Sequence, residues 1–339
     1  MARSFKQSAE AWLTRQWYAA EAPWAGLLPL ELAFRSAVAL RRLAYRNGLK
    51  ASTRLPVPVI VVGNLSVGGV GKTPLVVWIV QTLLEQGYRP GVISRGFGGT
   101  GSTEPLAVTG TSDPDRVGDE SVLIALRCGV PVYVHRDRVR AGKALLAAHD
   151  CDVIVSDDGL QHYGLARDLE IAVVDGERGF GNRHLLPAGP LREPVRRLDE
   201  VDLVVQRSRG GDDEIVMSIR GKVAVNLLNP QVVKPLAEFR REKLVAVAGI
   251  GYPQRFFDLL TEEQLDFEQR PFPDHHRFCP NDLRHDRGAV IMTEKDAVKC
   301  RVFASLEHWY VPVSAELSGS FRETFLTLLQ VKIDGQKAP

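Results

Sequence analysis

A glycine-rich stretch between a strand-like run and a helix-like run carries the clearest chemistry in this sequence. Residues 57–79 read VPVIVVGNLSVGGVGKTPLVVWI. Val59 to Val62 is a β-branched run, which is typical of a buried strand. The apolar run after Pro74 is long enough for a helix whose first turn holds the proline. A strand, a glycine-rich loop ending in Gly-Lys-Thr and a helix together predict a phosphate-binding P-loop.

The predicted loop suits a nucleoside triphosphate with Mg²⁺. Glycines let several backbone N–H groups face phosphate oxygens, and the helix N-terminus adds partial positive charge. We expect Lys72 to reach the β- and γ-phosphates and the Thr73 hydroxyl to bind Mg²⁺. Ser66 stands where the usual pattern has its first glycine, so a glycine-rich turn without a ligand is the alternative. The predicted nucleotide-binding residues are Gly68, Gly69, Val70, Gly71, Lys72, Thr73 and Pro74.

Two acidic pairs stand at positions where a P-loop enzyme uses carboxylates. Asp157 and Asp158 follow the strand-like run 153–156, and a carboxylate at such a strand end can hold the metal. An Asp-Gly turn that faces solvent is the alternative. Asp119 and Glu120 stand at an expected helix start, where simple capping and pairing with the helix dipole would also explain them.

Strand-like runs alternate with helix-like runs over residues 51–214, which predicts a P-loop kinase core with a parallel sheet and helices on both faces. Ligands bind such sheets at the carboxyl ends of the strands. We therefore expect the P-loop, Arg95, Asp119 and Asp157 to converge there. The long irregular segment 176–194 is expected to be functional.

From about residue 215 the pattern changes, and residues 215–339 are expected to form a smaller C-terminal α/β lobe. The stretch 216–230 alternates like an antiparallel strand pair, and residues 308–317 read as one last strand. In the core, the basic residues of the expected helix 138–149 are interpreted mostly as a solvated face. Those residues are Arg138, Arg140, Lys143 and His149.

Residues 1–50 differ from the rest of the chain. Three of the five tryptophans lie in the first 24 residues, and an arginine-rich amphipathic helix is expected after them. Such a helix can lie in a membrane interface. It can equally pack on the protein's own core with a solvated basic face, and the pattern alone favours this second reading.

Composition sets broader limits. The 45% apolar and 25% charged content is that of a globular protein, and a formal net charge of +2 gives no argument for a nucleic-acid partner. The four cysteines are far apart, which suits a reducing compartment better than a disulfide framework or a zinc site. We expect no secretory signal, no membrane-spanning helix and no obligate protein partner.

The stretch FPDHH at 272–276 places two histidines after an aspartate. Adjacent histidines point in different directions, and no further ligands have metal spacing, so structural or surface histidines are the simpler interpretation. A catalytic histidine requires that this loop fold over the P-loop core.

The chain resembles the tetraacyldisaccharide 4′-kinase (lipid A 4′-kinase) family of Gram-negative bacteria. The resemblance runs in order from the P-loop nearly to the end of the chain. It rests on GNLSVGGVGKTP (63–74), SRGFGG (94–99), VGDE (117–120), DDGLQH (157–162), GFGNRHLLPAGPLREP (179–194), FPDHH (272–276) and MTEKDAVK (292–299). The LLPAGPLREP and DDGLQH stretches are far more specific than the P-loop, and Ser66 is usual in that family.

The resemblance implies ATP-dependent phosphorylation of the 4′-hydroxyl of an acylated glucosamine disaccharide 1-phosphate, giving a 1,4′-bisphosphate lipid A precursor. It also implies that residues 1–50 bind the cytoplasmic face of the inner membrane peripherally, on an anionic surface, which overturns the packing interpretation. Lys72 and Thr73 are implied to bind phosphate and Mg²⁺, and Asp119 with His275 to ready the hydroxyl. The metal site would comprise Thr73, Asp157, Asp158 and Glu120, and the residues near nucleotide or substrate are Asn64, Arg95, Gln161 and Arg192.

The chain departs from its relatives at two places. Relatives often carry Ser or Thr where Val70 stands, so one side-chain contact to phosphate is lost while the backbone N–H remains. Relatives often read Gly-Arg at the position of Arg183-His184, so neither residue is given a role.

Two rival functions stay open on the motifs alone. One is a P-loop switch or metallochaperone-type NTPase, although the expected guanine motif has only the poor match Thr293-Glu294-Lys295-Asp296. The other is a soluble small-molecule kinase whose N-terminal helix simply packs. Nucleotide turnover with and without a lipid acceptor distinguishes a switch NTPase from a lipid kinase. Flotation with anionic liposomes distinguishes a soluble kinase from a membrane-bound one.

Overall fold

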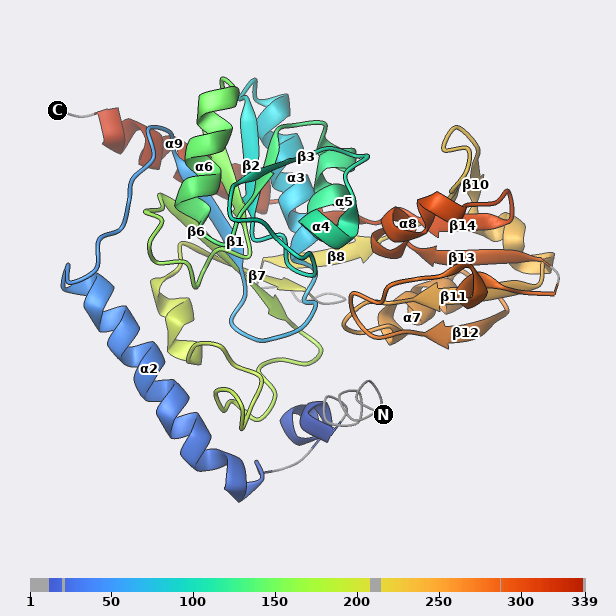
Figure 1. Ribbon diagram of the computed structural model, residues 1–339, viewed down its shortest axis with the longest axis horizontal. Helices are drawn as coiled ribbons and strands as arrows, with labels where there is room; N and C mark the ends of the chain where they lie inside the picture. Colours follow the sequence, from blue (N-terminus) through green and yellow to red (C-terminus); the bar gives the residue numbers. More distant parts are fainter. Residues whose placement is uncertain (1–11, 20–21, 208–214, 287, 338–339) are drawn as a thin grey trace.

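Two β-sheets organise the chain (Figure 1). The computed structural model describes residues 12–19, 22–207, 215–286 and 288–337. Within them the strands form a nine-stranded sheet, which carries the P-loop, and a six-stranded sheet beside it. We call the parts built on these sheets the larger and the smaller lobe.

The larger sheet is parallel except at its two edges, where β3 and β15 pair antiparallel with their neighbours. The buried strand predicted at 59–62 is central in it and has no exposed residue. In spatial order the strands are β15 (Ser314–Leu317), β8 (Val216–Arg220), β7 (Leu203–Arg207), β6 (Leu169–Asp175), β1 (Val59–Gly63), β5 (Val153–Asp157), β2 (Pro90–Ser94), β4 (Val132–Val134) and β3 (Leu106–Val108).

Helices cover both faces of this sheet, as the alternating pattern predicts. On one face α3 (Lys72–Glu85), α5 (Asp119–Cys128) and α9 (Phe321–Lys337) bury apolar side chains against the strands. On the other face α6 (Arg138–Ala148) packs together with the loops that follow β1, β5 and β6. The short helix α4 (Pro114–Val117) leads into α5. The parallel α/β core with helices on both faces is therefore confirmed.

The smaller sheet lies at one side of the larger lobe and mixes parallel and antiparallel pairs. Its strands, in order, are β10 (Val233–Pro235), β9 (Val223–Asn226), β14 (His308–Val311), β13 (Ala289–Thr293), β11 (Leu244–Ala248) and β12 (Phe267–Pro271). The helices of this lobe are α7 (Gln254–Glu262) and α8 (Glu294–Cys300). Short 3₁₀ helices connect the elements of both lobes: η1 (Ala25–Leu27), η2 (Val195–Glu200), η3 (Leu236–Arg241), η4 (Pro280–Leu283) and η5 (Arg301–Phe303).

The chain crosses between the two sheets twice, and both crossings correct the strand predictions. The expected antiparallel pair at 216–230 is wrong, because β8 joins the larger sheet and β9 the smaller one. The expected single strand at 308–317 is two strands, β14 and β15, which also belong to different sheets. Gly221 and Pro312 stand at these crossings. Pro312 has no N–H to offer a strand pair, which suits a break there.

The helix α2 (Leu28–Arg46) runs along the larger lobe, away from the smaller lobe (Figure 1). Its buried residues are the charged Glu31 and Arg42, whereas Leu32, Leu40 and Leu43 are exposed. This is the reverse of a helix that packs an apolar stripe on its own core. Within the described part of the chain, no helix combines the length and apolar character needed to cross a bilayer.

Candidate active site

The P-loop has the geometry that phosphate binding requires. It runs from the end of β1 to Lys72, the first residue of α3. Gly68 and Gly71 have φ angles of 102° and 89°, a left-handed conformation that favours glycine. Val70 is buried in the apolar core beneath the loop, so its side chain is directed away from a ligand while its backbone stays in the loop.

Basic and polar side chains converge behind the loop. Lys72 Nζ lies 3.0 Å from Asn64 Oδ1 and 3.4 Å from Asp158 Oδ1. Arg192, from the long loop after β6, donates to both carboxylate oxygens of Asp158 and to the Asn64 carbonyl oxygen. Gln161 Nε2 donates to the same carbonyl at 3.1 Å. Residues from three separate motifs therefore form one cluster: Asn64, Lys72, Asp158, Gln161 and Arg192.

Asp157 and Asp158 have opposite electrostatic environments. Burial and the nearby Glu120 raise the pKa of Asp157 to about 7, despite the attraction of Lys72. Burial also acts to raise the pKa of Asp158, but Lys72 and Arg192 outweigh it and hold that pKa well below its usual range. Asp157 is buried, and Asp158, whose side chain is 33% exposed, is paired with Lys72 and Arg192, so neither is the free carboxylate of a simple Asp-Gly turn.

A divalent cation fits the Asp157 side of this arrangement. Its Oδ1 atom is buried without a hydrogen-bond partner among the described residues, while Oδ2 accepts from Ser94 Oγ at 3.2 Å. A cation would relieve the repulsion between Asp157 and Glu120 that raises the pKa. Within the described residues, no three or more His, Cys, Asp or Glu side chains are grouped to hold a metal by themselves. Mg²⁺ commonly uses one or two carboxylates plus substrate phosphates, so this is compatible with a metal that arrives with ATP.

Asp119 and His275 meet across the boundary between the lobes. Asp119 opens α5 after Gly118, and His275 lies in the loop after β12 with a φ of 56°. His275 Nδ1 is 3.1 Å from both carboxylate oxygens of Asp119. This loop does fold over the P-loop core, which was the condition set for a catalytic histidine. His276 instead lies 3.0 Å from Asp282 and stacks on Phe272 within the smaller lobe.

The pair is electrostatically matched. Burial acts to raise the pKa of Asp119, but the hydrogen bond from His275 and the charges of Lys295 and Lys299 outweigh it and hold this pKa well below its usual range. Burial acts to lower the pKa of His275, but the hydrogen bond to Asp119 outweighs it and raises this pKa. The geometry is that of a carboxylate kept ionised by a hydrogen-bonded histidine and two nearby lysines, beyond simple helix capping.

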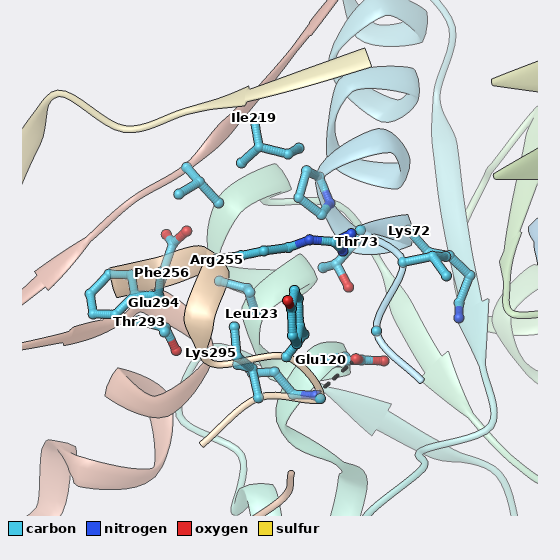
Figure 2. A pocket seen from close by; sticks show the side chains of 18 of the residues that line it. Lys72, Thr73, Glu120, Leu123, Ile219, Arg255, Phe256, Thr293, Glu294 and Lys295 are labelled. Atoms are coloured by element: carbon cyan, nitrogen blue, oxygen red, sulfur yellow. Dashed lines mark hydrogen bonds and ion pairs between the residues drawn. The ribbon is translucent and has the colours of Figure 1, made fainter. Parts of the chain in front are cut away.

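A cavity of about 180 Å³ lies between the lobes, next to the P-loop (Figure 2). Lys72 and Thr73 border it from the start of α3, and Phe256 lies across from them on α7. Gly251 of the smaller lobe approaches the P-loop so closely that a Cβ there would lie 2.9 Å from the Gly69 nitrogen. The lining is largely apolar, as suits a nucleotide base; it includes Leu123, Ile219, Ile250, Phe256, Leu259, Val311 and Val313.

A second, open hollow lies in the larger lobe and contains Arg95. The glycine-rich loop after β2 forms its wall, and Phe97 of this loop contacts the His275 ring at 5.1 Å between centroids. Arg116, Arg136 and Arg140 also line it. Arg95 thus does not line the P-loop cavity but belongs to this separate basic hollow, which lies on the His275 side.

Sequence reasoning missed several residues that the fold brings to the site. Arg138, expected on a solvated face, is buried and donates to the carbonyl oxygens of Asp157 and Asp158 at 3.3 and 3.2 Å. Lys295 lies 3.0 Å from Glu120. No periodicity signals Arg138, because its burial arises from the loop after β5. The lysines of MTEKDAVK were visible as a motif, but nothing in the motif says what they touch.

The fold and the site define a P-loop phosphotransferase-type α/β protein, in which a phosphate-binding loop faces a carboxylate–histidine pair. The model of the family "Tetraacyldisaccharide-1-P 4′-kinase" (LpxK) matches residues 24–330. The chain belongs to this family.

Relatives and a solved structure agree. The tetraacyldisaccharide 4′-kinase of Nitrosococcus oceani is 51% identical over 94% of this chain and 94% of its own length. That of Methylobacillus flagellatus is 48% identical over 95% of this chain and 97% of its own. The structure of LpxK from Aquifex aeolicus in complex with ATP superposes with a TM-score of 0.74 at 26% identity, covering 90% of this chain and 98% of that one.

Proposed function

We propose that the chain transfers the γ-phosphoryl group of ATP to the 4′-hydroxyl of a tetraacyl disaccharide 1-phosphate, with Asp119 as the group that accepts the hydroxyl proton. Family membership and an ATP-bound neighbour support the reaction. Neither a switch NTPase nor a soluble small-molecule kinase has comparable support. The observation that carries the site assignment is the contact between Asp119 and His275 beside the P-loop.

The donor half consists of the P-loop and the cavity. Phosphoryl transfer depends mainly on positioning and on neutralising charge. The loop amides and Lys72 would bind the triphosphate, and the apolar cavity would take the base. Lys72 must then leave its present partners Asn64 and Asp158. The charge of Asp158 remains neutralised by Arg192.

Mg²⁺ would be held by Asp157, Glu120 and the Thr73 hydroxyl, where its charge would bridge and neutralise phosphate oxygens. Asp158 suits this role less well, because Arg192 already donates to both of its oxygens. We therefore place Asp158 behind the metal, as a counter-charge for Lys72 and Arg192.

The acceptor half consists of Asp119, His275 and the basic hollow. Asp119 is ionised at neutral pH, so it can accept the 4′-hydroxyl proton as the phosphoryl group arrives, and His275 holds its orientation. A positioned base typically contributes about 10²–10⁴-fold. The arginines of the hollow, with Arg95 among them, would suit the anionic acceptor that approaches from that side.

The exposed leucines of α2 support peripheral binding to a membrane. Leu32, Leu40 and Leu43 face away from the protein, and the exposed Arg35 and Arg46 flank them. An apolar helix face with basic flanks suits the surface of an anionic leaflet, where each nearby arginine adds about 1 kcal/mol. We place the enzyme on the cytoplasmic face of the inner membrane, where ATP is available.

Transfer of ³²P from ATP to a tetraacyl disaccharide 1-phosphate tests this function. Wild-type protein should label the lipid, and Lys72→Ala should abolish labelling because the γ-phosphate loses its main counter-charge. Asp119→Ala should lower turnover by about 10²-fold or more while ATP still binds. Near wild-type turnover of purified Asp119→Ala would remove the base assignment, and no labelled lipid with wild-type protein would remove the function itself.

A further inference from the structure

The smaller lobe directs two lysines at the acidic start of α5. Lys295 and Lys299 lie four residues apart on α8, so they share one helix face. That face packs on α5, whose first two residues are Asp119 and Glu120. Each lysine reaches one of the two acids, and the motif MTEKDAVK that contains them has so far been given no role.

Lys299 contacts the proposed base directly. Its Nζ atom lies 3.4 Å from Asp119 Oδ2 and 2.9 Å from Asp296 Oδ1, and its side chain is only 8% exposed. The ammonium also lies 5.1 Å from the centre of the Phe278 ring. His275 occupies the same carboxylate from the other side. Asp119 is therefore held between two cations that both come from the smaller lobe.

Lys295 joins the two lobes at the neighbouring residue. Its Nζ atom lies 3.0 Å from Glu120 Oε1 in the larger lobe (Figure 2). The same atom lies 3.0 Å from Asp274 Oδ1 in the smaller lobe. Asp274 directly precedes His275, and its Oδ1 accepts the His275 backbone N–H at 3.0 Å. A single ammonium thus fixes the loop that carries His275 relative to the helix that carries Asp119.

Two buried lysines at one lobe boundary require an explanation. Burying an ammonium is unfavourable unless it is paired, and a buried ion pair is often no more stabilising than an apolar contact of the same size. Apolar packing of α8 on α5 would join the lobes equally well. What apolar packing would lack is the positive charge of Lys299 beside the Asp119 carboxylate and the hydrogen bond from Lys295 to Glu120.

We propose that Lys299 and Lys295 are positioning residues for phosphoryl transfer: they hold Asp119 and His275 in register across the boundary between the lobes. Neither lysine needs to touch the reacting atoms. Lys299 fixes the rotamer of Asp119, and Lys295 fixes the loop of His275 against α5. This proposal rests on the proposed function of Asp119, and a loss of register should lower kcat more than substrate affinity.

The test compares Lys299→Met, Lys295→Met and the matched control Lys143→Met, a change of the same kind at an exposed residue of α6. All are measured by lipid phosphorylation, after circular dichroism has verified folding. We expect Lys299→Met to lower kcat by about tenfold or more, with the KM for ATP within about twofold of wild type. Lys143→Met should match the wild type.

A double variant separates positioning from a structural role. If Lys299 acts through Asp119, adding Lys299→Met to Asp119→Asn should reduce kcat no further than Asp119→Asn alone. A multiplied loss would overturn the proposal, as would unchanged kcat in both single variants. If Lys299→Met does not fold, Lys295→Met carries the same test, since its partners Glu120 and Asp274 are 30% and 32% exposed and can be hydrated.

The result also separates this proposal from the assignment on which it rests. Full activity of Asp119→Asn would overturn the role of Asp119, and the lysine proposal with it. A crippled Asp119→Asn beside fully active lysine variants would overturn the lysine proposal alone.

Discussion

At the scale of single residues, the site depends on charges that are paired before any ligand arrives. Asp119 is only 3% exposed, yet it is ionised because His275, Lys295 and Lys299 surround it. Asp157 is near enough to Glu120 to feel its charge, and its pKa of about 7 reflects burial beside this like charge. The same helix start therefore offers a ready base on one side and a site for a cation on the other.

The Asp119–His275 pair should make stability depend on pH. The pKa of His275 is raised in the folded protein above its ordinary value of 6.5, so its contribution is fully present below pH 6.5 and is lost as pH rises through the raised pKa. We expect His275→Gln to destabilise the protein most at about pH 5.5 and least at about pH 9. Thermal melting of both proteins measures the difference.

The control for this prediction is the same comparison in an Asp119→Asn background. Without the Asp119 carboxylate, His275 keeps the weaker partner Asp274, 3.8 Å from its Nε2, while burial and Lys295 act to lower its pKa, so the loss of stability should no longer be larger at low pH. A difference in melting temperature between wild type and His275→Gln that stays constant from pH 5.5 to pH 9 would contradict the pairing.

At the scale of elements, α2 is the helix whose orientation carries most information. Glu31 accepts hydrogen bonds from Arg35, from His184 and from the Leu185 backbone N–H, and Arg42 pairs with Glu200. Through these contacts the charged side of α2 packs on the larger lobe, and its leucines face solvent. His184, which has no role assigned from the motifs, thus helps to hold α2 on the larger lobe.

Replacing Leu32, Leu40 and Leu43 together by Ser should abolish binding to anionic vesicles. These side chains are 65%, 67% and 52% exposed, so the fold should tolerate the change. Burying one leucine is worth about 1.5–3 kcal/mol, so losing three should weaken binding by far more than about tenfold. Flotation measures it, with Val302→Ser/Leu306→Ser as a control on exposed apolar residues of the smaller lobe. Equal flotation of both variants would refute the anchor.

At the scale of the whole molecule, the last elements of the chain, β15 and α9, belong to the larger lobe, which also contains the P-loop. The strand β15 extends the larger sheet, and α9 buries Phe321, Phe325 and Leu329 against it. The expected division into residues 51–214 and 215–339 stays a prediction about folding units. The sheets themselves place residues 223–311 in the smaller lobe and return the chain to the larger one after Pro312.

Phe321→Ala tests how much the larger lobe depends on this return. The side chain is fully buried, and truncating such a phenylalanine typically costs about 3–5 kcal/mol. Urea unfolding followed by circular dichroism should show this loss, whereas Val331→Ala, at an exposed position of α9, should change stability by less than about 0.5 kcal/mol. A loss for Phe321→Ala as small as that of Val331→Ala would mean that α9 is not part of the core.

Local sequence patterns and motifs were sufficient to predict the P-loop, the order of the functional motifs along the chain and the family. A P-loop is a local feature, since glycines, Lys72 and Thr73 act within one strand–loop–helix unit, and the buried runs at 59–62 and 153–156 follow from local periodicity. The contact between Asp119 and His275 was predicted only through the family resemblance, because 156 residues separate the two in the chain.

The contacts across the lobe boundary could not be predicted from local patterns, because they depend on long-range packing. Side-chain periodicity says which face of an element is apolar but not which element it meets, so β8 and β9 looked like partners although they belong to different sheets. For the same reason Arg138 was predicted to be solvated, and no contacts were predicted for Lys295 and Lys299. Their contacts with Glu120 and Asp119 exist because two sheets distant in sequence pack side by side, and that packing turns a nucleotide-binding loop into a site where a hydroxyl can be phosphorylated.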